Sequence, residues 1–139
     1  MRYVLDSSVA VKWVLNEPLS AEALKLREEY RQQLHDLLSP DTFVVEVAHA
    51  LTRAERKGIV PVGKAADLLA DVLTTRPTLH SYLPLVPRAV ELSSQLRIGV
   101  YDCLYAALSE REGCEIVTAD DRLVTSLSPQ FPVVPLSSL

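Results

Sequence analysis

Several residue types are scarce in this 139-residue chain, and each scarcity narrows the class of protein. The two cysteines, Cys103 and Cys114, are too few for a disulfide framework and lack the spacing of zinc ligands, so we expect reduced thiols in a cytoplasmic protein. Basic residues are outnumbered, with 14 Lys and Arg against 18 Asp and Glu, and the net charge of −4 argues against a broad basic surface for nucleic acid. The charge does not exclude an enzyme that cuts nucleic acid, because carboxylates that bind cations lower the formal charge.

Long apolar runs are absent as well. Asp6 and Lys12 break the most apolar N-terminal stretch well short of a membrane span, and Asp6 comes too early for a secretory signal, so we expect no membrane partner. Hydrophobic residues make up 48% of the chain, which argues against disorder. Because no repeat, low-complexity tract or linker divides the chain, we expect residues 1–139 to form a single domain with its own core.

Short apolar runs alternate along the chain with stripes of helical period. Strands are expected at residues 2–6, 37–38, 80–82, 115–118 and 133–134. Helices are expected at residues 7–15, 20–34, 39–57, 62–75, 86–96 and 102–112. Ser39 and Pro40 are typical of a helix start, and Gly58 is typical of a helix end. The alternation predicts a three-layer α/β/α fold, with helices on both faces of a central parallel sheet of four to five strands.

Four acidic residues stand beside core-forming segments, where a carboxylate loses hydration. Asp6 and Asp120 each follow a predicted strand, Asp102 opens a predicted helix, and Glu46 lies at the border of an apolar helical stripe. Since ligands bind at the carboxyl ends of parallel strands, we expect these acids to converge there. Two carboxylates about 4 Å apart repel by roughly 4 kcal/mol at an effective dielectric near 20, so such a group needs a counter-charge.

A shared divalent cation would supply that counter-charge. Magnesium or manganese suits a site made only of oxygen ligands, and such a centre can hold a phosphodiester and lower the pKa of an attacking water. The histidines are scattered without a common motif and do not suggest zinc; they are His35, His49 and His80.

Each acid also has an ordinary structural explanation. Asp6 could cap a helix, Asp102 could interact with a helix dipole, and Asp120 with Asp121 could form a turn. The conjunction of the four acids, rather than any one of them, favours a site. Trp13 is expected to anchor a core or an interface rather than to stack on a base.

The segments that carry the four acids resemble a known family. They read VLDSSV at 4–9, VEVAHAL at 45–51, VYDCLYAAL at 100–108 and VTADDRL at 117–123. In order and spacing they resemble the PIN-domain ribonucleases, and among them the small VapC toxins of bacterial and archaeal toxin–antitoxin pairs. The resemblance extends over essentially the whole chain.

The resemblance implies a PIN-like fold and a set of site residues. In the family, an acidic quartet binds magnesium or manganese, and the matching residues here are Asp6, Glu46, Asp102 and Asp120. Ser8 matches a small polar position that supports the first aspartate, and Thr118 matches a hydroxyl position beside the last. Asp121 adjoins the last acid, and the motif favours Asp120 over it as the ligand.

The resemblance also implies an activity and partners. Family members cut single-stranded RNA, often in the loops of structured RNAs, commonly form homodimers, and are inhibited by a VapB-type antitoxin. Two other phosphoryl-transfer families fit less well. A haloacid-dehalogenase-type phosphatase requires an acid where Ser8 stands, and a phospho-receiver domain requires an acidic pair after the first strand. A non-catalytic PIN-like binding module with a structural metal site is the alternative outside enzymes.

Overall fold

One sheet organises the molecule, and the computed structural model describes every residue from Met1 to Leu139. Its strands are β1 (Arg2–Leu5), β2 (Asp36–Pro40), β3 (Thr78–His80), β4 (Glu115–Thr118) and β5 (Val133–Pro135). Their order across the sheet is β3-β2-β1-β4-β5, and every neighbouring pair is parallel. The expected central parallel sheet is therefore confirmed, at the upper end of the predicted number of strands.

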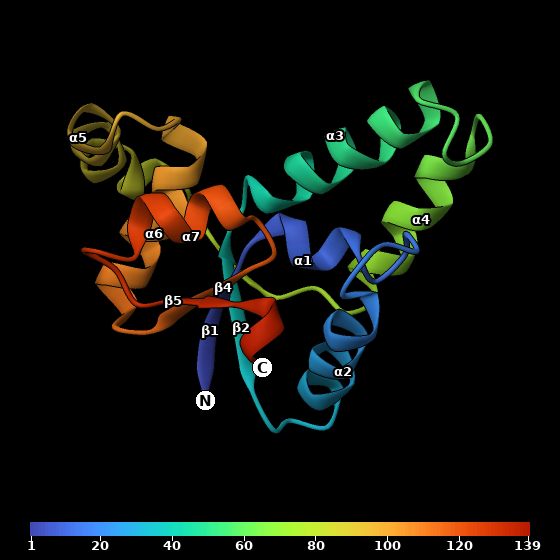
Figure 1. Ribbon diagram of the computed structural model, residues 1–139, viewed down its shortest axis with the longest axis horizontal. Helices are drawn as coiled ribbons and strands as arrows, with labels where there is room; N and C mark the ends of the chain where they lie inside the picture. Colours follow the sequence, from blue (N-terminus) through green and yellow to red (C-terminus); the bar gives the residue numbers. More distant parts are fainter.

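Helices cover both faces of this sheet (Figure 1). They are α1 (Ser7–Val11), α2 (Ser20–Arg31), α3 (Phe43–Arg56), α4 (Lys64–Leu73), α5 (Val86–Leu96), α6 (Val100–Glu112) and α7 (Asp121–Leu127), with short 3-10 turns at Leu83–Leu85 and Leu136–Ser138. Alternating strand residues divide the core: Tyr3 and Leu5 pack with α1 to α4, whereas Val4 packs with α5, α6 and α7. The fold is the predicted three-layer α/β/α arrangement.

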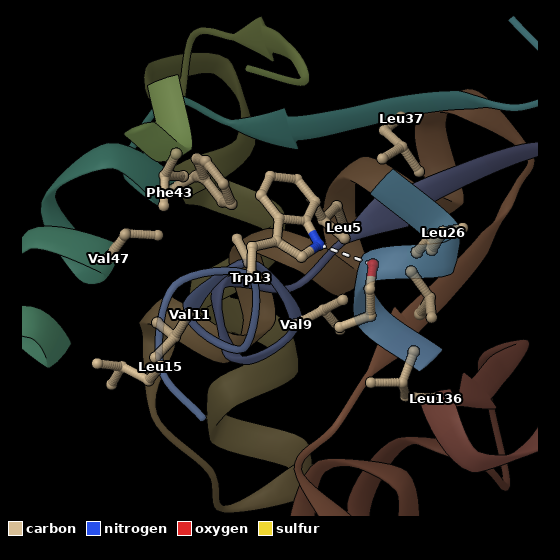
Figure 2. Close-up of a cluster of buried hydrophobic side chains, with 14 of the residues drawn as sticks. Leu5, Val9, Val11, Trp13, Leu15, Leu26, Leu37, Phe43, Val47 and Leu136 are labelled. Carbon is tan, nitrogen blue, oxygen red and sulfur yellow. Dashed lines mark hydrogen bonds between the residues drawn. The ribbon is translucent and has the colours of Figure 1, made fainter. Parts of the chain in front are cut away.

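Trp13 anchors the core on the α1 side of the sheet (Figure 2). The side chain is buried, and its Nε1 donates a hydrogen bond to the Ala23 carbonyl oxygen at 2.9 Å. The Arg27 guanidinium lies 4.9 Å from the ring centroid and also donates to Thr75 Oγ1 at 2.9 Å. Trp13 is thus a core residue, as expected, and Arg27 joins α2 to the end of α4.

The predicted helix start at Ser39 and Pro40 is wrong. Both residues belong to β2, and the helix begins at Phe43. Ser39 uses its hydroxyl to donate to the Leu5 carbonyl oxygen at 2.6 Å, so a contact with β1 replaces the expected helix cap. Pro40 ends β2, and the following amide, that of Asp41, donates to the His80 carbonyl oxygen at 2.8 Å, so the pairing with β3 continues past the proline.

Other boundaries also shift. The first helix ends at Val11, and α6 begins at Val100, with Asp102 in its first turn. The third strand is Thr78–His80, displaced from the predicted 80–82 because its residues pair in register with Leu38 to Pro40. Helix α7 was not predicted, since Asp120 and Asp121 suggested only a turn.

The strand order creates a crevice that positions the site. The chain builds outward from β1 to β2 and β3, then returns to the other side of β1 to form β4 and β5. β1 and β4 are therefore neighbours whose connections leave in opposite directions, and ligands of parallel sheets bind beyond the carboxyl ends of such a pair. Asp6 and Asp120 lie just past these two ends. None of the helices is both long enough and apolar enough to span a membrane.

Candidate active site

Asp6 is a buried carboxylate held by two hydroxyl groups. Its Oδ2 accepts hydrogen bonds from Ser8 Oγ at 2.6 Å and from Thr118 Oγ1 at 2.7 Å. Asp6 occupies the N-cap position of α1, but its side chain makes no capping hydrogen bond. Helix capping therefore does not explain this acid, which faces the β1–β4 crevice instead. Burial, opposed by the two hydroxyl donors, raises the pKa of Asp6.

Ser8 and Thr118 connect the two strand ends. Ser8 Oγ accepts from the Ala119 amide at 3.0 Å, and Thr118 Oγ1 accepts from the Asp120 amide at 3.0 Å. Each hydroxyl therefore donates to Asp6 while it accepts from the loop that leads to Asp120. Both residues lie where a supporting role was expected.

Glu46 reaches the crevice from the first turn of α3. Tyr105, which is fully buried on α6, donates from its hydroxyl to Glu46 Oε2 at 2.8 Å. The pKa of Glu46 is raised to about 7, first by burial and also by the charges of Asp6 and Asp102, while the hydrogen bond from Tyr105 opposes the shift.

Asp102 completes the electrostatic cluster from the first turn of α6. Its pKa is raised to about 6, first by burial and then by the charges of Asp6 and Asp120, and the Arg122 charge opposes the shift. Because Asp102 interacts with Asp6 and Asp120, and Glu46 with Asp6 and Asp102, each of the four acids is within electrostatic reach of at least two others. The structure thus brings together all four acids that the sequence singled out.

Asp120 and Asp121 are separated by their surroundings. Asp120 caps α7, because its Oδ1 accepts a hydrogen bond from the Arg122 amide at 3.0 Å. Asp120 also lines a cleft of about 270 Å³ together with Asp102. Asp121 is exposed and lines only a shallower groove on the outside of α7. The geometry therefore favours Asp120 as the acid that takes part in the site.

The donor set fits a hard divalent cation. The four acids at the centre offer carboxylate oxygens, and the charge of the exposed Arg122 opposes the raised pKa of Asp102. As the side chains stand, no three Asp, Glu, His or Cys side chains converge into a ready-made metal cage. In Asp6 and Glu46 the hydroxyl donors engage Oδ2 and Oε2, and these donors are neutral, so they do not supply the missing counter-charge.

Three residues at the site were not singled out from the sequence. They are Tyr105, Arg97 and Arg122, of which the two arginines line the cleft. A signal for Tyr105 existed, because it lies three residues after Asp102 on one helix and a buried tyrosine hydroxyl requires a partner. The histidines stay out of the site: His35 contacts Glu29, His80 contacts Arg111, and His49 is exposed.

Comparison with known proteins identifies the family. The PIN domain profile matches residues 3–125. The chain belongs to the PIN-domain family. Ribonuclease VapC3 of Pyrobaculum aerophilum is 30% identical to this PIN-family chain over 136 residues, which cover 96% of the chain and 98% of the relative.

Solved structures share the fold. The crystal structure of PAE2754 from Pyrobaculum aerophilum superposes with a TM-score of 0.72 at 20% identity, over 99% of this chain and 94% of that one. VapBC2 from Rickettsia felis, solved bound to a DNA fragment from their promoter, gives a TM-score of 0.66 at 15% identity, over 97% of this chain and 98% of the other. At these identities the likeness supports the PIN-like α/β/α fold.

Proposed function

We propose that this PIN-family chain is a divalent-metal-dependent endoribonuclease that cuts single-stranded or loop RNA. The observation that carries the proposal is the cluster of Asp6, Glu46, Asp102 and Asp120 in the β1–β4 crevice, where three of the acids have raised pKa values. Carboxylates in that state lack a counter-charge, which a magnesium or manganese ion would supply. The similarity to Ribonuclease VapC3 supports RNA as the substrate.

The residues of the site would have different roles in binding the cation and in cleavage. Asp6, Asp102 and Asp120 would hold the cation, directly or through water, and Glu46 would complete the shell or orient the attacking water. When bound, the cation can position the phosphodiester, lower the pKa of the attacking water and stabilise the leaving oxygen. Ser8 and Thr118 fix Asp6 through one oxygen and leave its other oxygen for the cation. Tyr105 fixes Glu46 in the same way.

The biological role that fits best is the toxin of a VapBC-type pair. The similarity to Ribonuclease VapC3 and the fold shared with VapBC2 support a VapB-type antitoxin as a protein partner. We propose that the chain acts in the cytoplasm as a homodimer, and that its RNA cleavage inhibits translation and growth until the antitoxin binds.

Cleavage of a labelled single-stranded RNA by the purified protein tests the activity. We expect cleavage with magnesium or manganese, none after chelation, and a loss of at least about 100-fold in Asp6→Asn and in Asp102→Asn. Asp36→Asn is the matched control, because Asp36 is exposed at the opposite end of the sheet, at the start of β2. Cleavage that persists without metal in both site variants would overturn the proposed mechanism.

A growth assay separates the enzyme from a binding module. Induced expression of the chain is expected to arrest growth, and Asp6→Asn or Asp102→Asn should abolish the arrest at equal protein levels. A non-catalytic module with a structural metal site would instead bind manganese without cleaving RNA, and any growth effect would not depend on cleavage.

A further inference from the structure

A cleft of about 270 Å³ opens beside the four acids, between the end of α5, the start of α6 and helix α7. Asp102 and Asp120 form part of its wall, so it is continuous with the proposed cation site. Its other side chains are charged or apolar, apart from the hydroxyl of Ser126. Arg97 and Arg122 supply positive charge, and Ile98 and Leu123 supply apolar surface.

Arg97 adopts a backbone conformation that arginine rarely takes. It follows the last residue of α5 with φ 60° and ψ 38°, in the left-handed region where helices usually place glycine. A residue held in this conformation is strained, and such strain is common at functional sites. Arg97 is exposed and takes no part in the ion pairs of the protein, so no structural contact of its charged group explains why arginine stands there.

Arg122 also makes few contacts through its charged group. Its side chain is 93% exposed, and its ion pair is a loose one, from Nε to Asp120 Oδ1 at 3.7 Å. Several other arginines of the chain do have structural partners: Arg27 is buried against α4, and Arg88 contacts Glu110 with two of its nitrogens. The cleft therefore holds two guanidinium groups with free donors, in a protein whose net charge is −4.

We propose that this cleft binds the backbone phosphate next to the scissile one in a single-stranded RNA, with Arg97 and Arg122 as its ligands. The proposal rests on the proposed ribonuclease function and extends it. Guanidinium groups bind phosphate through paired hydrogen bonds, and such contacts hold a nucleic acid in register without reading its sequence. The partly buried Ile98 would face the adjacent ribose or base.

RNA fits the cleft better than an acidic polypeptide does. The arginines adjoin Asp102 and Asp120, so a ligand bound by both arginines lies at the cation site itself. A phosphodiester chain has its next negative charge one nucleotide away and can satisfy the arginines and the cation together. Carboxylates of a peptide have no such fixed repeat.

The test measures binding apart from cleavage. The protein carries Asp6→Asn to slow cleavage, and the probe is a fluorescein-labelled single-stranded RNA of mixed sequence and about 12 nucleotides, titrated in magnesium at several salt concentrations. We expect Arg97→Gly and Arg122→Ala each to weaken binding about 5-fold and to reduce the salt slope by about 0.7, the value for one phosphate contact on a single strand. Arg53→Ala is the matched control, because Arg53 is exposed near the far end of α3 and should change neither quantity.

The Arg97→Gly variant also tests whether misfolding, rather than a lost phosphate contact, explains weaker RNA binding. Glycine relieves the strain of the left-handed backbone conformation. The Arg97→Gly variant should therefore melt at a temperature no lower than that of the parent protein, even though its affinity for RNA falls. With Asp6 restored, both arginine variants should raise KM about 5-fold, and kcat should change less than about twofold.

The outcomes are distinguishable. If the parent protein cleaves RNA but neither arginine variant changes affinity or salt slope, the subsite is refuted and the ribonuclease function stands. If the parent protein neither binds nor cleaves RNA, both proposals fail. If the variants weaken only the binding of a labelled oligoglutamate peptide, the cleft is a protein-docking site and the RNA subsite is wrong.

Discussion

At the scale of single residues, neutral hydroxyl groups hold two of the site's four acids in place. Ser8 and Thr118 donate to Asp6, and Tyr105 donates to Glu46. A lysine or arginine at these positions would orient the carboxylates equally well but would also neutralise them. Because a hydroxyl orients a carboxylate and leaves its charge, the cluster keeps its demand for an external cation.

The clearest prediction at this scale concerns Tyr105. Tyr105→Phe keeps the buried ring and removes only the hydroxyl, so Glu46 loses one hydrogen bond and its fixed orientation. We expect kcat to fall about 10-fold and the dissociation constant for manganese, measured by calorimetry, to rise by a similar factor. The free energy of unfolding should fall by only about 1 kcal/mol.

An exposed tyrosine provides a matched control. Tyr82 is 44% exposed in the loop before α5, so Tyr82→Phe should leave kcat, manganese affinity and stability unchanged. If Tyr105→Phe loses stability but keeps kcat and manganese affinity, Tyr105 is a core residue without a positioning role.

At the scale of elements, the sequence predicted which helices and strands exist, and their order, better than it predicted the residues at which they begin and end. Apolar runs and helical stripes are local features, and they located all five strands and six of the seven helices. Boundaries depend on contacts that a local pattern does not contain. Ser39 resembles a helix cap, but its hydroxyl bonds to Leu5 in the neighbouring strand. Helix α7 was missed because Asp120 and Asp121 are as typical of a turn as of a helix start.

The same distinction applies to the site. The four acids could be singled out because each stands against an apolar segment, and strand ends meet at one edge of a parallel sheet. Tyr105 could not be paired with Glu46, because 59 positions separate them and only the packing of α6 near α3 joins them. Arg97 was hidden for another reason: nothing local shows that this arginine adopts a left-handed backbone conformation.

Helix α7 separates the two adjacent aspartates, and this leads to a prediction. Asp120→Asn should reduce RNA cleavage at least about 100-fold, whereas Asp121→Asn should retain activity within about threefold. Asparagine caps helices about as well as aspartate, so α7 should persist in Asp120→Asn, and circular dichroism can verify this. The opposite ranking of the two variants in a cleavage assay would assign the metal-binding role to Asp121.

At the scale of the whole molecule, the two cores hold the acids together against their mutual repulsion. One core packs α1 to α4 against the sheet and the other packs α5 to α7, and the crevice lies where both meet the ends of β1 and β4. Unfolding would release the carboxylates into water and relieve their desolvation. The free energy of unfolding of the metal-free protein must therefore include an opposing contribution from this cluster.

The sign of that contribution fixes its pH dependence. The pKa of Glu46 rises on folding from 4.5 to about 7, and that of Asp102 from 3.8 to about 6, so the folded protein binds more protons than the unfolded chain between these values. A carboxyl group with a raised pKa destabilises the fold fully above its folded pKa, and the penalty disappears as the pH falls toward its unfolded pKa.

The metal-free protein should accordingly be more stable at about pH 5.5 than at about pH 8, by on the order of 2 kcal/mol once solvent screening at the partly exposed Asp102 is allowed for. Urea unfolding in the presence of a chelator measures this difference, and Glu46→Gln should abolish most of it, because glutamine stays neutral at both pH values. Magnesium should stabilise the protein more at the higher pH, where the acids are ionised and bind the cation best. A metal-free protein that loses stability steadily from about pH 8 to about pH 5.5 would show that the four acids are compensated within the fold, and that no cation is needed to hold them together.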